Sequence, residues 1–201
     1  MNKPVIYTIG HSIHQLDYFL ELLQKYSVNC IVDVRSTAAS RYNPQYNKKS
    51  LANFLADNKI RYMHFPEAFG ARQIDPALLD ENGQVDFEKV RRSQNFKKGV
   101  EQLREEVEKQ SVISLMCAES DPLVCHRFSM ISVALQRNGF DVIHIIKDKT
   151  TKSNTDLEYM LLNKYDKKIR KSDIFTPEIS VDDQLKMAYR LINKEIGYLK
   201  T

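Results

Sequence analysis

The sequence predicts an α/β fold with a mainly parallel five-stranded sheet, helices on both faces and a C-terminal helical extension. Short β-branched runs alternate with amphipathic stretches, and the runs are continuously apolar, as strands covered on both faces require. Strands that alternate with helices indicate βαβ crossovers and therefore a parallel sheet. We expect the α/β domain to span residues 1–148 and a basic, partly helical extension to span residues 149–201.

The five strands are predicted from apolar runs that end at a turn-forming or polar residue. The first run stops at Gly10, which permits a tight bend, and the third stops at Pro66. The runs are Val5–Ile9, Cys30–Val34, Ile60–Phe65, Val112–Met116 and Val142–Ile146.

Helices are predicted where apolar residues recur at helical spacing between these runs. Ser12 is a candidate N-cap for the first helix, whose apolar positions are Leu16, Phe19, Leu20 and Leu23. The other helices are expected at Ser50–Asn58, Phe87–Lys109, Val124–Asn138 and Asp182–Leu199. The segment Glu67–Asp86 contains Pro76 and two glycine turns and is predicted to be a loop.

Composition narrows the class of protein. Among 201 residues, 42% are hydrophobic and 28% charged, which indicates a chain with a packed core. The net charge of +4 is small for a protein that coats DNA. Three cysteines argue against a disulfide framework, and no apolar run reaches the roughly 18 residues of a membrane span. Without a signal-peptide pattern, we expect a cytoplasmic protein with no membrane partner.

Polar and reactive residues fall where the predicted strands end. Since ligands bind beyond the carboxyl ends of parallel strands, we expect these side chains to share one pocket. Substrate-binding candidates are Gly10, Ser12, Arg35, His126 and Arg127, and catalytic candidates are His11, Asp33, Cys117, Glu119 and Cys125.

The segment from Leu115 to Arg127 carries the strongest chemical signal. Cys117 ends a strand, and Cys125 lies in the first turn of a predicted helix, where free N–H groups favour a thiolate. Arg127 adds positive charge nearby. The same pattern also suits two thiols that merely fill space at a strand–helix junction.

Two shorter motifs supply further candidates. His11 follows a strand end and is either a proton carrier, a metal ligand or a residue that orders the loop. Asp33 and Arg35 share one face of a strand, so they form either a locking ion pair or an anion site in which Asp33 orients the anion or acts as a base. Cys30 and His144 lie within apolar strand patterns and are expected to be core residues.

These motifs resemble the domain of unknown function 488 family. The matching elements are Tyr7-Thr-Ile-Gly-His-Ser12, Asp33-Val-Arg35 and Met116-Cys-Ala-Glu119 followed by Cys125-His-Arg127, and the resemblance spans roughly residues 5–147. It implies a single α/β domain and assigns no reaction.

Three functions remain open. The first is an enzyme that binds an anionic small molecule, such as a nucleotide or phosphate ester, between Arg35 and Arg127 and uses thiolate or carboxylate chemistry. The second is a zinc or iron site built from Cys117, Cys125, His126 and His11. A redox pair formed by the first two of these residues is a further alternative.

The third function is a non-catalytic module that binds nucleic acid or a protein. Residues 147–171 hold eight Lys or Arg against four Asp or Glu, so the extension begins with a basic stretch. No aromatic ladder interleaves these lysines, which favours a solvated surface over a nucleic-acid site.

Overall fold

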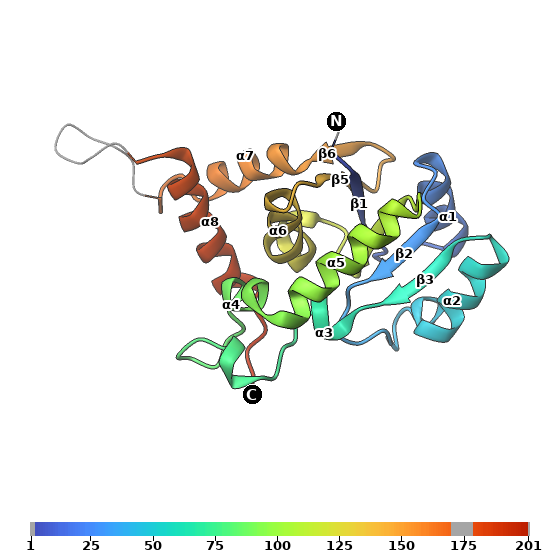
Figure 1. The fold of residues 1–201 in the computed structure, drawn as a ribbon, viewed down its shortest axis with the longest axis horizontal. Coiled ribbons are helices and arrows are strands. Elements are labelled where there is room, and N and C mark those ends of the chain that lie inside the picture. The colour runs from blue at the N-terminus through green and yellow to red at the C-terminus, as the bar shows by residue number, and fades with distance from the viewer. Residues whose placement is uncertain (1–2, 170–178, 201) are drawn as a thin grey trace.

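The computed structural model describes residues 3–169 and 179–200, which form one six-stranded sheet with helices packed around it (Figure 1). The strands are β1 Val5–Gly10, β2 Cys30–Asp33, β3 Arg61–His64, β4 Ile113–Cys117, β5 Asp141–Ile145 and β6 Thr151–Ser153. The helices are α1 Leu16–Lys25, α2 Lys48–Asp57, α3 Pro66–Phe69, α4 Phe87–Arg92, α5 Gln94–Glu108, α6 Val133–Arg137, α7 Asn154–Lys164 and α8 Val181–Ile196.

The sheet has the order β3-β2-β4-β1-β5-β6 and is parallel except for the antiparallel pair of β5 and β6. The prediction of five strands was therefore wrong by one. β6 has the sequence Thr-Lys-Ser and carries no apolar run, so hydrophobicity could not indicate it. A polar, three-residue strand is typical of a sheet edge.

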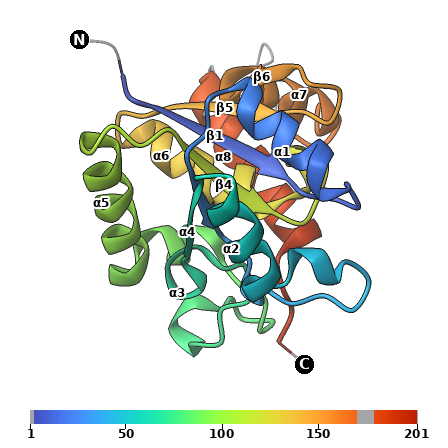
Figure 2. The ribbon, with the colours of Figure 1, turned by 90° about the vertical axis from the view of Figure 1, so that its right-hand side faces the viewer.

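Alternate residues of each strand enter two different hydrophobic clusters. Ile31 and Met116 pack with residues of α1 and α2, whereas Val32 and Leu115 pack with residues of α4, α5 and α6. Figure 2 shows α5 and α1 on opposite sides of the strands. This period of two follows from strand geometry, because successive side chains point to opposite faces.

The order of the strands creates a topological switch point between β1 and β4. The chain leaves β1 through α1 towards β2, and leaves β4 through α6 towards β5 on the other side of the sheet. Neighbouring strands whose connections diverge leave a crevice at their carboxyl ends, and ligands bind in such crevices.

Several helix boundaries differ from those predicted. Ser12 does not cap α1, which begins at Leu16 after Gln15; Ser12 instead has a φ of 48°. The expected helix Phe87–Lys109 is two helices, separated at Ser93. The expected loop Glu67–Asp86 contains most of α3 and a 3-10 turn at Pro76–Leu78.

The segment predicted as one helix, Val124–Asn138, is also subdivided. A 3-10 turn at Pro122–Val124 precedes a π-helical turn at Arg127–Ser132, and α6 follows. π-helical turns are rare and are frequent at functional sites. This turn directly follows Cys125 and His126.

The C-terminal segment packs onto the sheet domain. A third hydrophobic cluster joins α7 and α8 to Phe128 and Val133. Within the basic stretch, Lys149 pairs with Glu21 and Lys164 pairs with Glu195, so these cations lie apart and are partly neutralised. Residues 170–171 of that stretch, and residues 170–178 and 201 of the extension, lie outside the described residues. None of the described helices has the length and apolar character to cross a membrane.

Candidate functional site

A pocket of about 550 Å³ opens at the carboxyl ends of β1, β2 and β4. Its lining includes His11 and Ser12 after β1, Arg35 after β2, and Cys117 and Glu119 at the end of β4. His126, Arg72, several hydroxyl side chains and Asn43 complete the wall. The pocket therefore lies at the switch point, and the prediction that strand-end residues meet there is confirmed for these side chains.

Four side chains form a compact group beside this pocket, and three of them line it. The ligating atoms of Cys117, Glu119, Cys125 and His126 all lie within 4.8 Å of one another. Glu119 Oε2 is 2.7 Å from the Cys117 sulfur and 3.1 Å from the Cys125 sulfur. His126 Nδ1 is 3.7 and 3.9 Å from the same two sulfurs. We call this group the Cys-Glu-His cluster.

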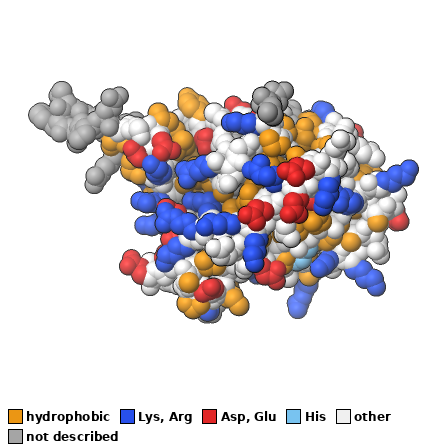
Figure 3. All heavy atoms as spheres, in the orientation of Figure 1, with side chains coloured by type: hydrophobic (Ala, Val, Ile, Leu, Met, Phe, Trp, Pro, Cys, Tyr) orange, Lys and Arg blue, Asp and Glu red, His pale blue; other side chains and the backbone are white. Residues whose placement is uncertain are grey.

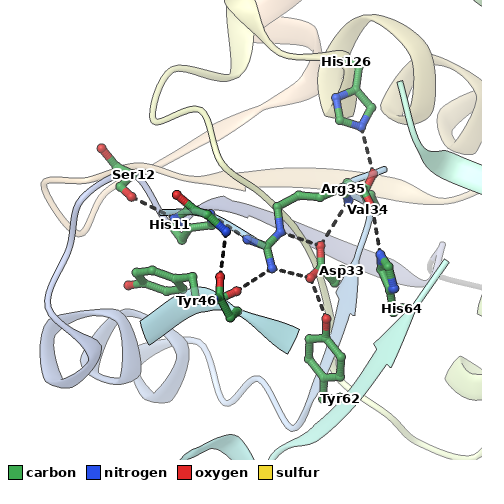
Figure 4. A network of polar contacts seen from close by, with 11 residues as sticks. His11, Ser12, Asp33, Val34, Arg35, Tyr46, Tyr62, His64 and His126 are labelled. Carbon is green, nitrogen blue, oxygen red and sulfur yellow. Dashed lines mark hydrogen bonds and ion pairs between the residues drawn. The ribbon is translucent and has the colours of Figure 1, made fainter. Parts of the chain in front are cut away.

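A backbone hydrogen bond fixes which nitrogen of His126 faces the cluster. Its Nε2 lies 3.1 Å from the carbonyl oxygen of Val34, which can only accept, so Nε2 carries a proton (Figure 4). Nδ1 is then the atom directed at the sulfurs. An imidazole held in this way by a backbone carbonyl is the usual arrangement of a metal-ligating histidine.

The two thiols share their negative charge unequally. Burial raises the pKa of Cys117, and the proximity of Cys125 raises it further. Burial also acts to raise the pKa of Cys125, but the thiol of Cys117 and the positive charge of Arg127 outweigh it, so this pKa falls well below its usual range. Cys125 is therefore the thiolate of the pair.

The charge of this thiolate affects the other two members of the cluster. Burial raises the pKa of Glu119, and the negative charge of Cys125 adds to that effect. Burial alone would lower the pKa of His126, yet hydrogen bonding and attraction to Cys125 raise it. A site that holds protons on groups so close to a thiolate can exchange those protons for a cation.

The backbone of the cluster is fixed from two sides. The N–H groups of His11 and Ser12 donate to the carbonyl oxygens of Cys117 and Ala118, each at 2.9 Å. Gly10 allows this approach, because a Cβ there would lie 1.8 Å from the carbonyl oxygen of Glu119. Gly10 and Ser12 thus act on the site through their backbone.

Arg127 supports the same loop through hydrogen bonds to its backbone. Its side chain is fully buried and does not line the pocket, so the structure does not bring it to where an anion clamp would lie. Nη1 and Nη2 donate to the carbonyl oxygens of Glu119 and Ser120, at 2.5 and 2.9 Å. Sequence spacing could not indicate this, because these contacts depend on how the loop between Cys117 and Arg127 folds.

Asp33 and Arg35 form a second polar network beside the cluster (Figure 4). Arg35 makes a bidentate ion pair with Asp33, with Nε 2.9 Å from Oδ1 and Nη2 2.6 Å from Oδ2. Its Nη2 also donates to the carbonyl oxygen of Tyr46. Tyr62 donates to Asp33 at 2.6 Å. Both members of the ion pair are buried, so the locking interaction left open by the sequence is present.

His11 belongs to this network and lies outside the Cys-Glu-His cluster. Its Nδ1 donates to the carbonyl oxygen of Ser12, and its Nε2 accepts from Arg35 at 3.2 Å. The ring stacks on Tyr46 with centroids 4.1 Å apart. Burial lowers the pKa of His11 to about 4, so the ring is neutral at neutral pH. The metal site considered from the sequence combined His11 with Cys117, Cys125 and His126. In the structure it is Glu119, and not His11, that lies with the other three.

Sequence reasoning placed Arg72 after the third strand at this edge of the sheet, but it did not assign Ser36 or Tyr62 to the site. The backbone N–H of Arg72 donates to the Ser36 hydroxyl at 2.8 Å, which brings the loop after α3 to the pocket. Tyr62 lies in β3, where its contact with Asp33 depends on the register of β2 and β3. These contacts join segments far apart in the chain, and local patterns carry no signal for them.

The fold and the cluster together define an α/β protein with a group of side chains that could hold a metal ion at the carboxyl edge of its sheet. Residues 15–133, more than half of the chain, match the domain of unknown function DUF488, and the protein belongs to this family. The family resemblance seen in the sequence is thereby confirmed. No curated protein shows a significant match to the chain.

Proposed function

We propose that the protein is a zinc-dependent enzyme that acts on a small anionic substrate in the pocket beside the Cys-Glu-His cluster. The observation that supports this proposal is the approach of four ligating atoms to within 4.8 Å of one another. Two thiols, an imidazole and a carboxylate are ligands typical of zinc.

The separations within the cluster suit a tetrahedral ion. With Zn–S bonds of about 2.3 Å and a Zn–N bond of about 2.0 Å, sulfur and nitrogen ligands stand about 3.6 Å apart. The two sulfurs lie 3.7 and 3.9 Å from His126 Nδ1. The carboxylate of Glu119 is closer to the sulfurs than this and would have to withdraw slightly, which its exposed position allows.

Glu119 gives the site an exchangeable position, because the residue as a whole is exposed although its carboxyl group is partly desolvated beside the two thiols. Cys117, Cys125 and His126 are buried, whereas Glu119 is exposed and lines the pocket. A zinc ion with one open position acidifies bound water and polarises carbonyl or phosphoryl oxygens. Glu119, once released from the ion, is placed to accept and return a proton in the pocket.

Two arginines in the pocket favour an anionic substrate. Four of the five N–H groups of Arg35 are used within the described part of the chain, which leaves one on Nη1 for a ligand. The guanidinium of Arg72 lies over the ring of Tyr198 and forms no ion pair with a described carboxylate. Arginine recognises carboxylates and phosphates through such free donors.

Elemental analysis of protein purified without added metal tests the proposal. We expect about one equivalent of zinc per chain, since three or four protein ligands typically retain zinc through purification. The variants Cys117→Ser and His126→Ala should lose most of it. Cys30→Ala is the matched control, because this buried thiol lies in β2 outside the cluster. Wild-type protein with less than a few tenths of an equivalent of any transition metal, after purification without chelators, would contradict the proposal.

The lowered pKa of Cys125 supports a second candidate, a thiolate nucleophile without metal. Limited alkylation with iodoacetamide, read by mass spectrometry, separates the two. If Cys117 or Cys125 is a nucleophile, it should be labelled faster than Cys30 in the metal-free protein. The same thiol should also be labelled faster than Cys30 in the protein as it is purified. Equal labelling of all three thiols would exclude the nucleophile.

A further inference from the structure

A second hollow, remote from the Cys-Glu-His cluster, lies between α4, α6 and α8. It has a volume of about 280 Å³, and its charged lining includes Arg91, Arg137, Lys186, Arg190 and Lys194. We propose that this hollow binds a ligand through its phosphate group. Figure 3 shows blue side chains gathered over this part of the molecule.

Three of the cations come from one face of α8. Lys186, Arg190 and Lys194 are spaced four residues apart, so they lie one above the other along the helix. Lys186 pairs with Asp182 and Asp183, and Arg190 lies 3.6 Å from Glu88, so Lys194 is the member of this row without an ion pair among the described residues.

The carboxylates of the hollow are already engaged. Asp86 accepts from the backbone N–H groups of Glu88 and Lys89, and Asp80 accepts from those of Asn82 and Gln84. Glu88 is shared between Arg92 and Arg190. Within the described residues, none of these carboxylates forms an ion pair with Arg91 or Arg137.

Arg91 is a partly buried cation whose desolvation the nearby charges of Glu88 and Asp86 do not outweigh. Its one hydrogen bond within the described residues runs from Nη1 to the carbonyl oxygen of Ser129, at 3.1 Å. Arg137 is its neighbour and forms no ion pair within the described residues. Burial lowers the pKa of Arg91 to about 10, and the charge of Arg137 adds to this shift.

Two guanidinium groups that line one hollow and have unused N–H donors suit a phosphate. Phosphate oxygens accept several charge-assisted hydrogen bonds at once, and arginine binds them through two parallel donors. Four N–H groups of Arg91 remain for such contacts. The exposed cations of α8 would then neutralise a second phosphate or an extended backbone.

Titrations with pyrophosphate and with a short single-stranded DNA test the proposal. Arg91→Gln should weaken binding of the preferred probe at least about tenfold, as expected for loss of charge-assisted hydrogen bonds. Lys97→Gln, at an exposed position of α5 outside both pockets, should change the affinity less than about twofold.

The two probes distinguish the source of the phosphate. Arg91-dependent binding of pyrophosphate indicates a small phosphate ligand, and Arg91-dependent binding of DNA alone indicates a nucleic-acid backbone. Should Arg91→Gln fail to fold, Arg137→Gln, at an exposed position, provides the same comparison. Equal affinities for wild-type protein and both hollow variants, or no binding of either probe, would overturn the proposal. Neither result depends on the zinc content of the first site.

Discussion

His144 in β5 is a polar core residue that lies in neither of the two pockets. The side chain is fully buried, with Nδ1 2.8 Å from the hydroxyl of Thr8 and Nε2 3.3 Å from the side-chain oxygen of Asn154. A neutral ring satisfies both contacts, because it accepts from the hydroxyl and donates to the amide oxygen. The prediction of a satisfied core histidine is confirmed.

The burial of His144 as a neutral ring should make the protein less stable in acid. Burial lowers the pKa of His144 from 6.5 to about 3, so the unfolded chain binds the proton more tightly than the folded one. Its contribution is complete above pH 6.5 and is lost as the pH falls towards 3. At pH 5 the free energy of unfolding should be about 2 kcal/mol lower than at pH 7 from this group.

Urea unfolding of wild-type protein and His144→Gln at both pH values checks this. The variant should show a weaker pH dependence, since the other titrating groups, including His11, remain in both proteins. Identical pH dependence in the two proteins would contradict the assignment.

At the scale of elements, the apolar strands were predictable and the breaks between helices were not. β1, β2, β4 and β5 are buried runs, and burial on both faces leaves a continuous hydrophobic signal. Helical spacing of apolar residues continues from α4 into α5 across Ser93, which hides the break. β6 was missed because pairing, and not hydrophobicity, defines it.

Removing the side chain of Ser93 should measurably lower the stability of the protein. This side chain accepts from the backbone N–H of Phe96 at 3.2 Å and so caps α5. Ser93→Ala should lower the free energy of unfolding by about 1 kcal/mol. Ser50→Ala, at an exposed position within α2, should change it by less than about 0.5 kcal/mol. Urea denaturation measures the free energy of unfolding of both variants. If Ser93→Ala loses no more of it than Ser50→Ala does, the cap contributes nothing.

The candidate site was predictable to the same degree as the strands that carry it. Strand ends placed Cys117, Glu119 and Arg35 at one edge because parallel strands end together. The partners of Asp33 and His126 were not predictable, since they lie on neighbouring segments of the sheet. Those of Arg127 and Glu119 were not predictable either, since they depend on how the loop between Cys117 and Arg127 folds.

At the scale of the whole molecule, the C-terminal segment is bound to the sheet domain by apolar and polar contacts. Ile192 of α8 is fully buried in the cluster that contains Phe128 and Leu161. Asn193 accepts from the backbone N–H of Phe87 and donates to the carbonyl oxygen of Val85. We therefore expect α8 to unfold together with the sheet.

Ile192→Ala tests this expectation. The substitution should lower the free energy of unfolding by about 3 kcal/mol, as for other buried large-to-small changes. Ile74→Ala is the matched control, because Ile74 is 72% exposed; its effect should stay below about 0.5 kcal/mol. Circular dichroism and tyrosine fluorescence should report one coincident transition. A separate early transition, or equal effects of the two variants, would show that α8 is not integrated.

All four members of the Cys-Glu-His cluster come from ten consecutive residues, 117–126. A denatured polypeptide keeps such neighbours close and can still chelate an ion. Zinc would then be held, less tightly, before the sheet assembles. Its contribution to the folding equilibrium is the difference between the two affinities, so it falls short of what the native dissociation constant alone implies.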